Sequence, residues 1–368
     1  MQFETYPFEK LNRLLSDVTP NSEYTPLSLT IGEPQFDTPQ FIQQGLQKNA
    51  HLLKKYPKTG GLPELKDAQR AFVSKRFDVA LDQDQIITTF GTREVLFNFP
   101  QFLLFDKKDP VMAYTNPFYQ IYEGAAIASL SRSIYIEVGE FLSTKQMQEV
   151  DFVIINYPNN PTANSVDLDH FKQWVRYALE YDFVLLNDEC YSEIYFQTPP
   201  PSLLQAAKAV GNERFKNILV VNSISKRSSA PGLRSGFIAG DATVLNSYMR
   251  YRTYVGVASP LPLQEAAVVA WHDEQHVKEF RAIYAQNMDI AKEVLDIQPP
   301  QATFYIWLYV KDDLAFAKKL YKEYNVTVIP GSFLGRQKAG RGYVRLALVL
   351  EPKQMRQALE RVATALQN

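Results

Sequence analysis

The sequence predicts an α/β fold in which a mixed, mostly parallel sheet is flanked by helices and accompanied by a smaller α+β domain. Three observations support this prediction. Short apolar runs alternate with longer helical patterns through the middle of the chain, polar side chains follow several of these runs, and the C-terminal part contains two further helices around two strands. Alternating strands and helices are typical of parallel sheets with helices on both faces.

The expected strands are short and apolar, as buried strands are. They cover residues 110–114, 152–157, 183–188, 218–223 and 237–240. The longer helical patterns cover residues 169–181, 261–273 and 276–294. In the C-terminal part, helices are expected at 314–324 and 352–366, and strands at 326–329 and 343–349.

A chain of 368 residues is long enough for two domains. We expect residues 46–275 to form the large domain. Residues 276–368 are expected to form the small C-terminal domain, and the N-terminal segment 1–45 is expected to join it.

Composition indicates an ordinary globular protein, with 46% hydrophobic and 21% charged residues. A net charge of −1 provides no basic surface for nucleic acid or an anionic membrane. Cys190 is the only cysteine, so an intrachain disulfide is excluded and a reducing compartment is expected. No apolar run reaches the ~20 residues that span a bilayer, and residues 1–10 lack an export signal. We therefore expect a cytoplasmic protein.

The segment 222–237 indicates a specific chemistry. Ser223, Lys226 and Arg234 follow the apolar run 218–221. A lysine can form a Schiff base with the aldehyde of pyridoxal 5′-phosphate (PLP), while a hydroxyl and a guanidinium bind the phosphate. The same serine–x–x–lysine spacing also occurs in enzymes whose serine is the nucleophile. Other motifs must therefore decide between the two.

Two strand ends carry side chains suited to the ring of PLP. Asp188 ends the run 183–188 and Tyr191 follows three residues later, at the edge where α/β enzymes bind ligands. A buried aspartate can pair with the pyridine nitrogen, and the tyrosine can hydrogen-bond the phenolic oxygen. Asn160, in a rigid loop after residues 152–155, can donate to the same oxygen. Each motif alone also fits an ordinary turn.

Two further motifs suggest anion sites. Gly91, Thr92 and Arg93 precede a helical pattern, where backbone N–H groups face an anion. Arg345 lies inside an apolar strand pattern. A buried guanidinium is costly unless it is paired, so either a substrate carboxylate or a structural salt bridge is expected there.

Together, the order and spacing of these motifs resemble the aspartate aminotransferase family of fold-type I PLP enzymes. Segments 29–39 and 56–66 also resemble the substrate loop and a tyrosine-bearing segment of that family. The resemblance implies a PLP-dependent aminotransferase that acts on amino acids and 2-oxo acids, works as a homodimer and follows ping-pong kinetics.

The resemblance also implies a role for each matching residue. Lys226 would carry the Schiff base and move the proton, Asp188 would pair with the ring nitrogen, and Tyr191 and Asn160 would bind the phenolic oxygen. Tyr119 would stack on the ring. The phosphate would be held by Gly91, Thr92, Arg93, Ser223 and Arg234, with Tyr56 of the other subunit. Arg345 and Asn160 would bind the substrate α-carboxylate, and Gly32 would allow close approach of the backbone.

A narrower resemblance is to the succinyldiaminopimelate aminotransferases of lysine and diaminopimelate biosynthesis. These enzymes exchange an amino group between N-succinyl-LL-2,6-diaminopimelate and 2-oxoglutarate. The similar segments are Y-P-F-E-K-L at Tyr6, G-T-R-E at Gly91, N-P-F-Y-Q-I-Y-E-G-A-A at Asn116, C-Y-S-E-I-Y-F at Cys190 and Y-N-V-T-V-I-P-G-S at Tyr324.

The chain departs from the family pattern at two places. Ala163 stands where a glycine usually follows the Asn-Pro-Thr turn. No arginine occupies residues 254–260, where aspartate aminotransferases bind the distal carboxylate. Arg93, Arg227 and Arg252 are the candidates for holding the distal end of the substrate.

Other functions remain open at this level. The same constellation serves aspartate and aromatic aminotransferases and PLP β-lyases, and some transcription regulators carry an aminotransferase-like domain. A regulator would need an added DNA-binding domain, for which the first ~30 residues are too short. His272 and His276 have the spacing of half a zinc site, but no third ligand is evident, so we expect no metal.

Overall fold

The computed structural model describes residues 3–367, and its α/β architecture confirms the predicted fold class. A mixed seven-stranded sheet has the order β2-β8-β7-β6-β5-β3-β4, in which only β8 runs antiparallel to its neighbours. Its strands are β2 (Ile86–Thr89), β3 (Val111–Asn116), β4 (Arg132–Glu137), β5 (Phe152–Ile155), β6 (Val184–Asp188), β7 (Ile218–Ser223) and β8 (Gly236–Gly240).

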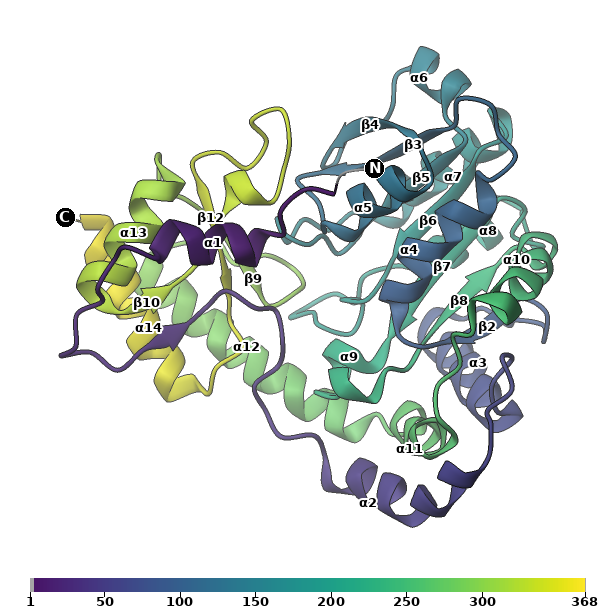
Figure 1. Cartoon of the computed structure of the whole chain (residues 1–368), viewed down its shortest axis with the longest axis horizontal. Coiled ribbons are helices and arrows are strands. Elements are labelled where there is room, and N and C mark those ends of the chain that lie inside the picture. Colours follow the sequence, from purple (N-terminus) through teal and green to yellow (C-terminus); the bar gives the residue numbers. More distant parts are fainter. Residues whose placement is uncertain (1–2, 368) are drawn as a thin grey trace.

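Both faces of this sheet are covered by helices, because its central strands are apolar on both sides (Figure 1). In β5, Val153 and Ile155 pack into one core and Phe152 and Ile154 into the other. The first core is covered by α3 (Pro63–Phe77), α6 (Thr144–Glu149), α7 (Leu168–Glu180), α8 (Leu203–Ala209) and α11 (Leu261–His272). The second is covered by α4 (Thr92–Leu103), α5 (Ile121–Ala128) and α10 (Ala242–Val255).

A smaller α+β unit, on the left of Figure 1, combines both ends of the chain. Its three-stranded antiparallel sheet has the order β11-β12-β9, and a second sheet pairs β1 with β10. The strands are β1 (Leu27–Ser28), β9 (Tyr305–Tyr309), β10 (Val326–Thr327), β11 (Ile329–Pro330) and β12 (Tyr343–Ala347). The helices are α1 (Pro7–Leu15), α12 (Gln275–Leu295), α13 (Asp313–Tyr324) and α14 (Pro352–Gln367).

Short elements complete the chain. These are α2 (Gln40–Asn49), η1 (Ala50–Lys54), α9 (Ile224–Arg227), η2 (Pro231–Leu233) and η3 (Gly331–Phe333). The segment that joins the small unit leads into α2, which packs against α11 of the large unit. The expected boundaries at 45/46 and 275/276 stay predictions, and residues 1, 2 and 368 lie outside the described part.

The five strands expected in the middle of the chain coincide with β3 and β5–β8. Sequence reasoning missed β1, β2, β4 and β9. Strand β4 is an edge strand in which buried and half-buried side chains alternate between exposed ends, so it lacks a continuous apolar run. Strand β9 consists of aromatic and aliphatic residues, and only its pairing with β12 distinguishes it from other apolar segments.

This topology places polar residues at one edge of the large sheet. Strands β5, β6 and β7 are parallel neighbours, so their carboxyl ends lie side by side. Asp188 ends β6, Ser223 ends β7, and Asn156 follows β5. Within residues 3–367, no helix is long and apolar enough to cross a membrane.

Candidate active site

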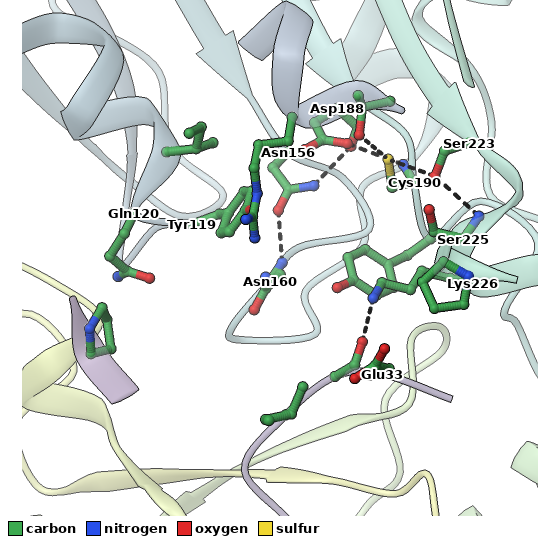
Figure 2. A pocket seen from close by; sticks show the side chains of 18 of the residues that line it. Glu33, Tyr119, Gln120, Asn156, Asn160, Asp188, Cys190, Ser223, Ser225 and Lys226 are labelled. Carbon is green, nitrogen blue, oxygen red and sulfur yellow. Dashed lines mark hydrogen bonds between the residues drawn. The ribbon is translucent and has the colours of Figure 1, made fainter. Parts of the chain in front are cut away.

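A cavity of about 790 Å³ lies at the carboxyl edge of the large sheet and is lined on its other side by residues of the small unit. Figure 2 shows Asp188, Cys190 and Ser223 along one side and Glu33 on the opposite side, with Lys226 between them. The residues expected from sequence that line it are Gly32, Thr92, Arg93, Tyr119, Asn160, Asp188, Tyr191, Ser223, Lys226, Arg234 and Arg345. Gly91 lies directly before Thr92, whereas Tyr56 is fully exposed and lines no part of it.

Lys226 lies on α9, a single helical turn that begins where β7 ends. The Ser223 hydroxyl caps this turn by accepting the backbone N–H of Ser225 at 3.4 Å. The Lys226 ammonium donates to the carbonyl oxygen of Gly32. Burial lowers the pKa of Lys226 to about 8, with smaller contributions from Arg345 and Arg93 in the same direction. A lysine with such a pKa can hold or release a proton near neutral pH.

Asp188 is buried at the end of β6. Its Oδ2 accepts the Tyr122 hydroxyl at 2.8 Å, and its Oδ1 accepts the backbone N–H of Cys190 at 3.2 Å. Burial raises the pKa of Asp188, and the hydrogen bonds from Cys190 and Tyr122 act against this rise. No ion pair to this carboxylate occurs within residues 3–367, so a cationic atom of a ligand would complete its environment.

Arg345 lies on β12 with 5% of its surface exposed. Its Nη1 donates to Asn160 Oδ1 at 2.7 Å and its Nη2 donates to the Thr30 carbonyl at 2.6 Å, while Nε is buried without a partner. Both acceptors are neutral, and in the described part of the chain no carboxylate pairs with this guanidinium. The structural salt bridge considered from the sequence is therefore absent there, and the charge of Arg345 is left for a ligand.

A second anion-binding element is formed by the start of α4 and the loop before β8. Arg234 has φ of 52° and donates to the carbonyls of Pro231 at 2.9 Å and Phe90 at 3.2 Å. Burial and the neighbouring Arg93 guanidinium lower the pKa of Arg234. A Cβ atom on Gly91, whose φ is +71°, would lie 2.3 Å from Arg234 Nη2. Only glycine therefore permits this approach of the guanidinium.

Tyr119 and Arg93 lie beside this element. The Tyr119 hydroxyl accepts Arg93 Nε at 2.8 Å, and its ring meets the Tyr122 ring edge-on, with centroids 5.8 Å apart. The remaining guanidinium nitrogens of Arg93 have no hydrogen-bond partner among residues 3–367, and the side chain is exposed to the cavity. Arg93 can therefore reach either a cofactor or a substrate.

The family profile for class I and II aminotransferases matches residues 24–362, which is most of the chain. The chain belongs to the class I and II aminotransferases.

Solved structures of this family share the fold over their full length. The chain resembles the aminotransferase AspB from Helicobacter pylori 26695, with 47% identity, a TM-score of 0.98 and 100% coverage of both chains. It also resembles an aminotransferase from Neisseria meningitidis Z2491, with 38% identity, a TM-score of 0.94 and coverage of 99% and 98%. A curated relative, the putative aminotransferase AatC of Rhizobium meliloti, is 32% identical over 97% of this chain and 92% of its own length.

Class I and II aminotransferases depend on PLP, and the cavity of this aminotransferase fits that group. Among residues 3–367, no cation forms an ion pair with the buried Asp188 carboxylate and no acid forms one with the Arg234 guanidinium, and Lys226, whose pKa is lowered, lines the same cavity. A protonated ring nitrogen, a phosphate and an aldehyde would satisfy these three groups in turn.

We expect Gly91→Ala to weaken PLP binding by roughly 10- to 100-fold, because the new Cβ displaces the Arg234 guanidinium. The affinity can be measured by titrating cofactor-free protein with PLP. Gly211→Ala is the matched control, since Gly211 has φ of +83° and open space around it. Equal losses of affinity in the two variants would contradict the steric explanation.

In cofactor-free protein, Lys226→Met should increase the free energy of unfolding at pH 7 by roughly 2–3 kcal/mol. The folded chain binds this proton with a pKa of about 8 and the unfolded chain with a pKa near 10.5, so the charged form is penalised on folding. The gain should therefore shrink as pH rises from about 8 to about 10.5. Urea unfolding at several pH values measures it, with the exposed Lys353→Met as control; a pH-independent gain would refute the prediction.

Two distal-end candidates do not reach the cavity of this aminotransferase. Arg227 pairs with Glu274 at 2.7 Å, and Arg252 pairs with Glu94 at 2.6 Å. Both guanidinium groups are buried and already neutralised, so only Arg93 of the three candidates faces the cavity. The physical reason is helix packing: Arg227 pairs with the residue that precedes α12, and Arg252 pairs with a residue of α4.

Sequence reasoning missed four residues in or beside the cavity. Asn156 donates to the Asp188 carbonyl at 2.8 Å and its Oδ1 accepts the Asn160 N–H at 2.8 Å. Tyr122 contacts Asp188 as described above, and the Tyr191 hydroxyl lies 2.9 Å from the Tyr305 hydroxyl. Cys190 lies 3.2 Å from Thr92 Oγ1. Tyr122 and Cys190 stand within segments quoted above and Asn156 lies in the expected strand 152–157, but Tyr305 carries no local signal.

One histidine of the pair at 272 and 276 is held by side chains of the protein. His276 contacts Asp273 at 2.5 Å and Ser228 at 2.8 Å. No group of three or more metal-binding side chains occurs in the part of the chain that the structure describes.

Proposed function

We propose that this aminotransferase transfers the α-amino group of N-succinyl-LL-2,6-diaminopimelate to 2-oxoglutarate, within the pathway to diaminopimelate and lysine. The observation that carries the proposal is that no acidic side chain among residues 3–367 pairs with Arg345. Its buried guanidinium has only neutral partners and faces a large cavity, which suits the α-carboxylate of an amino acid.

The distal part of the cavity supports a long substrate. Arg252, the nearest cation to the usual aspartate-binding position, is neutralised by Glu94. The cavity instead continues to Arg93 and to Tyr6 and Phe8 at the start of the small unit. A cation with apolar and aromatic neighbours can accept a succinyl carboxylate and its methylene groups.

Relatives support a substrate of this class. The LL-diaminopimelate aminotransferase of Maridesulfovibrio salexigens is 28% identical over 97% of this chain and 96% of its own length. Unacylated LL-diaminopimelate is therefore the second candidate substrate. The cavity also contains Glu33, whose carboxylate could bind the distal ammonium of that compound.

In the proposed reaction each residue has a separate task. PLP, when bound, supplies the electron-withdrawing ring that makes the α-proton of the amino acid acidic. Lys226 Nζ accepts this proton and returns it, because its pKa of about 8 permits both states near neutral pH. Asp188 would place its negative charge beside the ring nitrogen and so keep that nitrogen protonated. Arg345 and Asn160 would orient the α-carboxylate, and Tyr191 would donate to the phenolic oxygen.

A half-reaction screen tests the proposal. Purified protein loaded with PLP is mixed with one amino donor at a time, and loss of the pyridoxal absorbance and growth of the pyridoxamine absorbance are followed. We expect rapid conversion by glutamate and N-succinyl-LL-diaminopimelate and slow conversion by aspartate. Double-reciprocal plots of initial rate against the concentration of one substrate, at several fixed concentrations of the other, should give parallel lines, as a ping-pong sequence requires.

Other outcomes discriminate the alternatives. Rapid conversion by LL-diaminopimelate and none by its succinyl form favours the second candidate. Rapid conversion by aspartate or aromatic amino acids alone contradicts both substrates but leaves the aminotransferase chemistry intact. Release of many equivalents of keto acid and ammonia per enzyme without an amino acceptor would indicate a β-lyase, because a transaminase releases only one equivalent in the half-reaction.

We also propose a homodimer in which Tyr56 contacts the PLP phosphate of the partner. Tyr56 is fully exposed in the single chain, and the nearby Leu53 and the separate Tyr254 are 73% and 92% exposed. Such exposure of large apolar groups is typical of an interface. Sedimentation should give twice the chain mass, and Tyr56→Phe should weaken PLP binding without dissociating the dimer; a monomeric holoenzyme contradicts this.

A further inference from the structure

Tyr305 has no role in any motif of the sequence, yet it contacts three groups of the cavity. It lies on β9, next to β12, and Arg345 pairs with Trp307 in this antiparallel register. Residues two apart on a strand share a face, so Tyr305 and Arg345 are diagonal neighbours on the same face of the sheet. The Arg345 guanidinium carbon lies 4.4 Å from the centre of the Tyr305 ring.

The Tyr305 hydroxyl has one described partner, the Tyr191 hydroxyl at 2.9 Å. Both tyrosines are buried, with 2% and 6% of their surfaces exposed. A Cβ atom built on Gly32 would lie 1.7 Å from the Tyr305 hydroxyl oxygen. The glycine therefore lets the backbone pack directly against this hydroxyl, on which Tyr191 also packs.

We propose that Tyr305 is a positioning residue that acts through Tyr191: its hydroxyl donates to the Tyr191 oxygen and thereby directs the Tyr191 proton toward the cofactor. The inference rests on the proposed role of Tyr191 as donor to the phenolic oxygen. Each hydroxyl has a single proton, so the direction of this hydrogen bond decides whether Tyr191 can donate outward. Hydrogen bonds in such a chain also strengthen one another.

Two properties of the pair support a positioning role. Burial raises the pKa of Tyr191, so Tyr191 keeps its proton at neutral pH and has one to donate. The Tyr305 ring meanwhile lies against Arg345, so one side chain contacts both the proposed carboxylate site and the proposed phenolic-oxygen donor. A shift of Tyr305 would therefore move both the proposed carboxylate site and the proposed hydrogen-bond donor to the cofactor.

The test is a pH titration of the visible absorbance of the PLP-loaded protein without any substrate. A hydrogen-bond donor aimed at the phenolic oxygen favours the proton-free form of the bound cofactor. Loss of that donor therefore raises the pKa of the cofactor that is read from its visible absorbance, called the absorbance pKa below. We expect Tyr191→Phe to raise it, and Tyr305→Phe to raise it by a smaller amount, about half a pH unit or less. The double variant should match Tyr191→Phe alone, because Tyr305 acts only through Tyr191.

A matched control comes from the same aromatic cluster. Tyr284 is buried against Phe304, and its hydroxyl has no hydrogen-bond partner in the described chain. Tyr284→Phe should leave the absorbance pKa unchanged. Tyr305→Leu should additionally raise KM for the amino donor, because it removes the ring beside Arg345, whereas Tyr305→Phe should not.

The outcomes separate this inference from the proposed function. A normal absorbance pKa in Tyr305→Phe together with a raised one in Tyr191→Phe overturns the role of Tyr305 alone. Additive shifts in the double variant also overturn it. No shift in Tyr191→Phe overturns the role of both tyrosines, while the substrate assignment is unaffected because no substrate enters the titration.

Discussion

Lys226→Ala is expected to slow amino transfer on the order of 10⁴-fold or more, while the chain stays folded and still binds PLP. Lys226 is the only lysine that lines the cavity in the described chain, so no other amine there can take over its proton transfer. Proton transfer by a positioned group contributes ~10²–10⁴-fold, and the loss of covalent attachment adds to this. Single-turnover absorbance changes with an amino donor measure the loss.

Two controls distinguish a chemical from a structural effect. A small amine added to Lys226→Ala should restore part of the rate, since it can enter the space left by the side chain and accept the proton. Lys226→Arg should stay inactive, because a guanidinium does not release its proton at neutral pH. A Lys226→Ala variant with more than a tenth of the wild-type rate would contradict the assignment.

Arg345→Met should raise KM for both the amino donor and 2-oxoglutarate and lower kcat/KM by roughly 10²–10³-fold. The guanidinium is buried and has no acidic partner among residues 3–367, so its charge is available to the α-carboxylate that both substrates share. Loss of one partner of a buried charged pair costs about 2–5 kcal/mol, which sets this range. Steady-state kinetics with each substrate varied in turn provide the measurement.

The choice of controls follows from the same contacts. Arg345→Lys keeps the charge but cannot reproduce the two-pronged geometry, so it should recover only part of kcat/KM. Arg361→Met, which removes a guanidinium bound to the Thr25 carbonyl far from the cavity, should leave both KM values unchanged. If KM rises for only one substrate, Arg345 holds a distal group rather than the shared α-carboxylate.

Much of the candidate site could be predicted from the sequence, because its chemistry follows directly from strand ends. Asp188 and Ser223 are the last residues of β6 and β7, and Lys226 lies one helical turn later. Parallel neighbouring strands end at the same edge, so residues that follow them come together without further information. The fold class could be predicted for the same reason, since alternating apolar runs and helical patterns require a covered sheet.

The environment of each charge could not be predicted. Nothing in the sequence favours one of Arg93, Arg227 and Arg252 over the others as the residue that holds the distal end of the substrate. In the structure, Arg227 forms an ion pair with Glu274 and Arg252 forms one with Glu94. Partners 47 and 158 residues away in the chain decide this. Ion pairing depends on which helices pack together, and no local pattern records that packing.

By itself, the sequence determined the fold class and the set of groups at the sheet edge, because both depend on short segments. Only the tertiary structure decided that Tyr305 lies between Tyr191 and Arg345 and that Arg345 has no acidic partner in the described chain. These facts depend on the register of β9 against β12 and on the position of the small unit over the large sheet. Register and domain placement result from packing between distant segments, so they exist only once the chain has folded.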